Sequence, residues 1–142
     1  MLIHAPKEKV HSVMLQDEAY RKWTAVFSPT SFFRGDWKEG SKMLFIGLDD
    51  QGKEGGMLSR IKKNTLGEVV SIEHYGMLKD GEEITSGDEV ESWAGAMENY
   101  YFKDVDGGTL LSIEMDSDEQ CNDFLDKAWP KALEILKSIC EG

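Results

Sequence analysis

The chain has 142 residues, of which 40% are hydrophobic and 30% charged, and its formal net charge is −11 at pH 7. This length suits one domain that buries its own core, and the composition excludes the fibrous and disordered classes. The excess of acidic residues disfavours a nucleic-acid partner, because its phosphates would be repelled. The longest stretch without a charged side chain, residues 23–33, is well short of the roughly 20 residues that span a membrane.

We therefore expect a single domain over residues 1–142 with no membrane span. The first residues show neither an apolar run nor a cleavage site of the signal-peptide kind, so we expect a cytoplasmic location. Cys121 and Cys140 fall on one predicted helix, about 28 Å apart at 1.5 Å per residue, which is too far for a disulfide. His4, His11 and His74 are too scattered to indicate a zinc site, and no motif indicates a cofactor.

Two short helices are predicted near the N-terminus. The first covers Lys7–Leu15, because Pro6 precedes apolar residues at helical spacing. The second begins at Asp17 and ends at Ser28-Pro29, since the residue before a proline avoids the helical region. Its apolar positions fall on one side and are Tyr20, Trp23 and Phe27.

Between residues 31 and 116 the pattern changes to period two with tight turns, which predicts an antiparallel sheet. The candidate strands are Ser31–Arg34, Lys42–Leu48, Gly56–Lys63, Glu68–Met77, Gly95–Val105 and Thr109–Met115. The long connection Ile84–Ala94 is expected to hold one helical turn, and its length makes it a candidate mobile lid.

The C-terminal helix is the clearest predicted element. Ser117 and Gln120 form a capping box, and apolar side chains recur at helical spacing from Cys121 to Ile139. About six strands and one long helix predict an α+β fold in which the sheet curls around the helix. Such packing leaves space beside the helix, and small ligands commonly bind in concave apolar spaces of this kind.

The chain carries the motifs Ile3–Val10, Tyr20–Trp23, Gly35–Trp37, Ile72–His74, Trp93 and Gly107–Thr109. Together they resemble the SRPBCC superfamily of START-like, helix-grip domains, in the branch similar to the C-terminal domain of the activator of heat shock protein 90 ATPase. The resemblance implies a curved antiparallel sheet around a long C-terminal helix, two short helices near the N-terminus, and a hydrophobic ligand held between sheet and helix. Family members usually open with a full strand, so the four residues before Ala5-Pro6 predict either a clipped first strand or a chain that begins late.

A polar pair is predicted inside the apolar cavity, where it either stabilises the fold as a mutually satisfied histidine and carboxylate or contacts a ligand. Alternation along Glu68–Met77 turns His74 inward, and on Gly95–Val105 it turns Glu98 inward with Tyr100. We expect a register that sets His74 opposite Glu98, Ile72 opposite Tyr100 and Val70 opposite Phe102. The candidate ligand-binding residues are Phe45, Ile72, His74, Trp93, Glu98, Tyr100, Phe102, Met115, Phe124 and Trp129.

The leading hypothesis is a non-enzymatic domain that encloses a small apolar or amphipathic molecule. Two alternatives stay open. The resemblance to the chaperone activator implies a co-regulator of a heat-shock chaperone ATPase that acts by protein–protein contact. The third possibility is an enzyme that uses His74 and Glu98 as acid and base inside the cavity.

Overall fold

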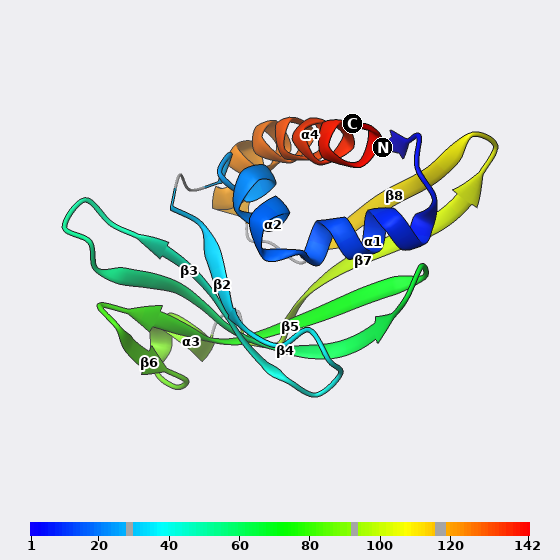
Figure 1. Ribbon diagram of the computed structural model, residues 1–142. Helices are drawn as coiled ribbons and strands as arrows, with labels where there is room; N and C mark the ends of the chain where they lie inside the picture. Colours follow the sequence, from blue (N-terminus) through cyan, green and yellow to red (C-terminus); the bar gives the residue numbers. More distant parts are fainter. Residues whose placement is uncertain (28–29, 92–93, 116–118) are drawn as a thin grey trace.

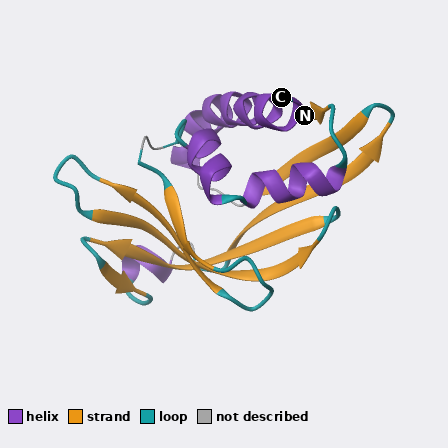
Figure 2. Ribbon diagram, viewed as in Figure 1, coloured by secondary structure: helices purple, strands orange, loops and turns teal. Residues whose placement is uncertain are grey.

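The computed structural model describes residues 1–27, 30–91, 94–115 and 119–142, without the side chains of Glu89 and residues 119–126. It is an α+β fold in which one twisted, curved antiparallel sheet carries its two N-terminal helices and its long C-terminal helix on one face (Figures 1 and 2). No described helix is long and apolar enough to cross a membrane. Within the same residues, no three His, Cys, Asp or Glu side chains gather as a metal site would require.

The sheet has the strand order β1-β8-β7-β5-β4-β3-β2, and β6 pairs with β5 beside this path. The strands are β1 (Leu2–Ile3), β2 (Phe32–Gly35), β3 (Lys42–Leu48), β4 (Glu54–Thr65), β5 (Val69–Lys79), β6 (Glu82–Ile84), β7 (Ala96–Val105) and β8 (Gly108–Met115). All six predicted strands are confirmed, with ends that shift by up to two residues. The short strand β6 is not among the predicted ones.

The helices are α1 (Lys7–Leu15), α2 (Asp17–Thr24), α3 (Asp88–Glu91) and α4 (Glu119–Glu141). α1 has the predicted bounds, whereas α2 ends at Thr24, earlier than predicted. The predicted stop at Ser28-Pro29, the capping residue Ser117 and the side chains of Gln120 and Cys121 lie outside the described part of the chain. Cys140 is buried and free.

Helices α1, α2 and α4 pack together over one face of the sheet, which we call the inner face (Figure 1). Burial along β5 alternates as predicted: every second residue from Val70 to Leu78 is buried. Val70 and Ile72 of this set belong to the core beneath the helices, whereas Gly76 lies against Leu58 and Ile84. The fully buried side chains of the resulting core include Ile3, Val10, Met14, Trp23, Met43, Ile61, Val70, Ile72, Leu111 and Leu136.

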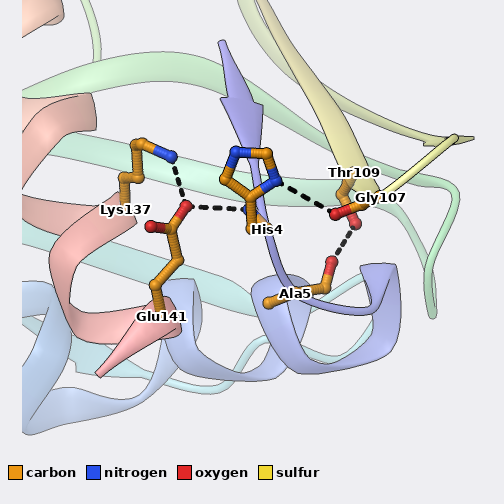
Figure 3. A network of polar contacts seen from close by, with 6 residues as sticks. All are labelled: His4, Ala5, Gly107, Thr109, Lys137 and Glu141. Atoms are coloured by element: carbon orange, nitrogen blue, oxygen red, sulfur yellow. Dashed lines mark hydrogen bonds and ion pairs between the residues drawn. The ribbon is translucent and has the colours of Figure 1, made fainter.

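A polar clasp joins the N-terminal segment, the β7–β8 turn and the end of α4 (Figure 3). The backbone N–H of His4 donates to Glu141 Oε2 at 2.8 Å, and the same carboxylate pairs with Lys137. His4 Nδ1 lies 3.1 Å from the Gly107 carbonyl, and the Thr109 hydroxyl donates to the Ala5 carbonyl at 2.7 Å. These contacts hold β1 on β8 although β1 is only two residues long.

Candidate functional site

Four polar side chains meet on the inner face: Ser59, His74, Glu98 and Tyr100, which we call the polar cluster. Ser59 comes from β4, His74 from β5, and the other two from β7. His74 Nε2 lies 3.5 Å from Glu98 Oε1, and the Tyr100 hydroxyl donates to Glu98 Oε2. The predicted contact between His74 and Glu98 is therefore present.

The predicted pairing of these two strands is wrong by two residues. Glu98 lies opposite Ile72, Tyr100 lies opposite Val70, and His74 lies opposite Ala96. His74 and Glu98 therefore meet diagonally, over a distance that long side chains can span. A shift of two residues keeps every side chain on its predicted face, which explains why the contact survives the wrong register.

A β-bulge brings Ser59 to His74. Leu58 pairs with Gly76 and Ser59 pairs with His74, so Tyr75 is an extra residue on β5. Ser59 Oγ lies 2.6 Å from His74 Nδ1. Because a carboxylate only accepts hydrogen bonds, Nε2 carries the hydrogen toward Glu98, and in the neutral ring Nδ1 accepts from the Ser59 hydroxyl. Ser59 is 0% exposed, so it orients the imidazole and cannot contact a substrate as a nucleophile.

Burial and the Glu98 carboxylate act together on Tyr100. Burial is the larger cause that raises the pKa of the Tyr100 phenol well above its ordinary value, and the negative charge of Glu98 adds to it. The phenol therefore stays protonated and continues to donate to Glu98. One oxygen of the carboxylate is engaged in this bond, while the other faces His74 at a longer distance.

Aromatic rings surround the polar cluster. We call this set the aromatic lining: Tyr20, Phe33, Trp37, Phe45 and Trp129. The Phe45 ring lies 6.1 Å from the His74 ring and 6.1 Å from that of Tyr20, and the Trp129 ring lies 6.2 Å from that of Tyr100. The pKa of Tyr20 is raised by burial and then by Glu98, against a hydrogen bond with Ser31 that lowers it.

The lining is not sealed. Phe33, Trp37, Phe45 and Trp129 are each only half-buried. The side chains of His74 and Glu98 keep 11% and 16% of their surface exposed. In addition, Nε1 of Trp37 is buried and has no hydrogen-bond partner within the described part of the chain. An unpaired buried donor of this kind costs about 1–3 kcal/mol, which an acceptor would recover.

The other predicted site residues divide into three groups. Met115 lies beside Trp129, whose Nε1–H donates to the Met115 sulfur at 3.1 Å. Ile72 and Phe102 are buried in the core, and Phe102 stacks on His11 with ring centroids 4.7 Å apart. Trp93 and the side chain of Phe124 lie outside the described part of the chain.

The sequence analysis missed Ser59 and did not place Tyr20 or Trp37 at the site. Tyr20 carried a signal, because a phenol on an apolar helix face needs a polar partner when it is buried. Ser59 carried none, since its orientation depends on a bulge that alternation does not reveal.

A separate open pocket of about 690 Å³ lies between α1, the β2–β3 connection and the β4–β5 turn. It is lined by His11, Ser12, Leu15, Asp36, Trp37, Lys38, Glu39, Asn64 and Leu66. None of the predicted ligand-binding residues lines it. Its buried histidine is fully engaged, because His11 Nε2 contacts Asn64 Oδ1 at 2.8 Å and Nδ1 accepts from the Gly67 N–H at 3.1 Å.

No protein-family model and no curated protein sequence matches the chain. Solved structures do. The AHSA1-like protein from Aeromonas hydrophila is 15% identical, with a TM-score of 0.68 over 98% of this chain and 87% of that one. The Aha1 dimer from Colwellia psychrerythraea is 20% identical, with a TM-score of 0.65 over 99% and 92%. Protein CV1439 from Chromobacterium violaceum is 19% identical, with a TM-score of 0.67 over 100% and 94%.

These likenesses extend over nearly the whole of each chain, while the sequence identities are low. They agree with the observed curved sheet, the short N-terminal helices and the long helix α4. The chain therefore shares the fold of these structures, a helix-grip fold in which a curved antiparallel sheet packs against a long C-terminal helix.

Proposed function

We propose that this protein binds a small apolar or amphipathic molecule between the sheet and α4, with the polar end of the ligand at the polar cluster. The observation that carries the proposal is the incomplete burial of large aromatic rings on the inner face. Phe33 and Phe45 of the sheet lie against Tyr20 of α2, and Trp129 of α4 lies against Phe27, yet all three rings remain half-buried. Ligand sites are mostly apolar surfaces with a few convergent polar groups, and this composition is found here.

Two further features support a ligand. Among the described residues, the buried N–H of Trp37 has no acceptor; its ring packs against Tyr20 and Phe45 in the lining and also lines the open pocket beside His11. Glu98 is inward-facing and keeps accessible surface on its carboxylate side chain. Buried polar groups in folded proteins are normally satisfied, so the unpaired N–H of Trp37 suggests a missing partner.

The experiment is a titration with N-phenyl-1-naphthylamine, a neutral apolar probe whose fluorescence rises in apolar surroundings. In the variant Met115→Trp, a larger side chain would occupy the space beside Trp129. We expect saturable binding of the probe to the wild type and its loss in this variant. Leu110→Trp is the matched control, because Leu110 lies on the same strand, is exposed and points to the outer face.

Equal binding to the wild type and to Met115→Trp would place the probe elsewhere and would overturn the proposal. Absence of saturable binding to the wild type would do the same. Unfolding curves of both tryptophan variants show whether a loss of binding reflects a filled site or an unfolded chain.

Contact with a heat-shock chaperone and catalysis by His74 and Glu98 stay predictions. The first is supported by the fold that the chain shares with Aha1-like proteins, and a pull-down with the chaperone of the host tests it. Catalysis is supported by the contact between the His74 imidazole and the Glu98 carboxylate. Ser59, the serine next to His74, is fully buried and therefore offers no nucleophile to a substrate. If the variant His74→Gln turned over every tested substrate as fast as the wild type, the hypothesis of catalysis would be wrong.

A further inference from the structure

Around the polar cluster, the described residues place one carboxylate, that of Glu98, and no lysine or arginine in contact with it. Within the described residues, the only ion-pair partner of Glu98 is His74. The two phenols that lie close enough to act on Glu98, Tyr20 and Tyr100, are neutral because their pKa values are raised. The described chain therefore places no lysine, arginine or ionised phenol beside the Glu98 carboxylate.

Rings elsewhere in the molecule provide an internal comparison. There the chain supplies its own cations: the guanidinium carbon of Arg21, on α2, lies 5.2 Å from the Phe32 ring centroid, and that of Arg60, on β4, lies 5.0 Å from the Tyr75 centroid. In the described part of the chain, no ring of the aromatic lining receives a lysine or an arginine in this way. The inner rings thus have the negative faces that attract cations, without a cation of their own.

The Glu98 carboxylate and the surrounding rings favour some polar head groups of a ligand over others. An anionic head would meet the Glu98 carboxylate and the faces of aromatic rings, both of which repel it. A neutral head would hydrogen-bond with the cluster but would leave the carboxylate uncompensated. A cation gains from both features, because a partly desolvated carboxylate and several rings stabilise the same charge.

The geometry points to an amphipathic cation as the ligand class: an apolar body against the aromatic lining, with a protonated amine or a quaternary ammonium group beside Glu98 and Tyr20. This inference rests on the proposed function and specifies its ligand. Tyr100 is a positioning residue, since its hydroxyl bond fixes one oxygen of the Glu98 carboxylate. The Ser59 hydroxyl acts through His74 in the same way.

The test compares three probes of equal chain length: octyltrimethylammonium, 1-octanol and octanoate. Each displaces N-phenyl-1-naphthylamine from the wild type and from Glu98→Gln. We expect octyltrimethylammonium to bind the wild type about tenfold more tightly than octanol does, with octanoate weakest. In Glu98→Gln, the advantage of the cation should disappear, while the affinity for octanol should change less than about twofold.

The net charge of −11 attracts any cation to the surface, so the control must remove the same charge elsewhere. Glu114→Gln does this, because Glu114 is exposed on β8 and pairs with Asn99, on the opposite face from Glu98. We expect this variant to keep the cation preference of the wild type. Equal losses in both variants would show general charge attraction and would overturn the inference.

A second pair of variants tests the rings and keeps the inference falsifiable if Glu98→Gln does not fold. Phe45→Leu removes a ring of the lining, and Phe32→Leu removes one that points to the outer face. We expect only Phe45→Leu to weaken octyltrimethylammonium more than octanol. Equal affinity of the wild type for the three probes would overturn the inference and leave the proposed function standing, whereas binding of none of them would overturn both.

Discussion

His74 Nε2 lies 3.5 Å from Glu98 Oε1, although the two residues are not opposite each other in the sheet. The diagonal contact joins β5 and β7, the two strands at the centre of the inner face. At one end of this contact, Ser59 hydrogen-bonds with His74 Nδ1, and at the other end the Tyr100 hydroxyl donates to Glu98 Oε2. A single polar chain thus crosses three strands below the helices.

Removal of the Ser59 hydroxyl should destabilise the protein measurably. In Ser59→Ala the buried Nδ1 of His74 loses its partner, which costs about 1–3 kcal/mol of unfolding free energy. Ser112→Ala, at an exposed position of β8, should change it by less than about 0.5 kcal/mol. Urea denaturation measures both values. Similar values for the two variants would show that the bond to His74 adds nothing.

Alkaline pH should weaken the fold through Tyr100. The pKa of Tyr100 in the folded state lies above the unfolded value of about 10. The protonated phenol therefore makes its full contribution to the unfolding free energy below pH 10, and this contribution declines as the pH rises above 10. The unfolding free energy of the wild type should therefore fall between pH 10 and 11. Tyr100→Phe should be less stable at neutral pH and should show a smaller decline. A slope identical to that of the wild type would refute this role.

Mild acid should weaken the attachment of α1 through His11. Burial lowers the pKa of His11, against the opposing effect of its hydrogen bond with Asn64. The neutral His11 ring therefore makes its full contribution to the unfolding free energy above pH 6.5, which is about the pKa of histidine in the unfolded chain. This contribution is lost as the pH falls toward the pKa of His11 in the folded state. Denaturation curves between pH 7.5 and 5.5 should show falling stability. The decline should be smaller in His11→Gln than in the wild type, and an equal decline would contradict this role of His11.

Gly56 should tolerate no side chain. Its φ is +148°, and a Cβ there would lie 1.8 Å from the carbonyl oxygen of Phe45. Gly56→Ala must therefore displace β3 and with it the Phe45 ring. Gly52→Ala meets nothing within 4 Å and should cost only about 1–2 kcal/mol for its left-handed backbone. We expect Gly56→Ala to cost at least about 2 kcal/mol more and to weaken probe binding, as measured by denaturation and fluorescence. Equal costs would contradict this packing.

Local signals were enough to predict most elements of the fold. The strand Lys42–Leu48 and the helix Lys7–Leu15 have the predicted bounds, because a turn or a proline borders each of them. The three-residue strand β6 was not predicted, since so short an edge segment has too few residues for a clear alternation. The early end of α2 follows no local stop signal in its sequence.

The candidate site was predicted only in part, for reasons of geometry. Alternation assigns a face to His74 and Glu98 but cannot distinguish registers that differ by two residues. The actual register depends on the connection between β5 and β7, which holds β6 and α3. The contribution of Tyr20 from α2 depends on how a helix lies across the sheet, and this packing is not encoded at any one position of the sequence.

The most direct test locates a bound cation by NMR. In the complex with octyltrimethylammonium, intermolecular NOEs should connect the N-methyl protons to the rings of Tyr20 and Phe45, and the alkyl chain to Trp129. NOEs that connect the probe to Leu15 and Leu66 would instead place it in the open pocket near His11. That result would contradict a ligand site between the sheet and α4.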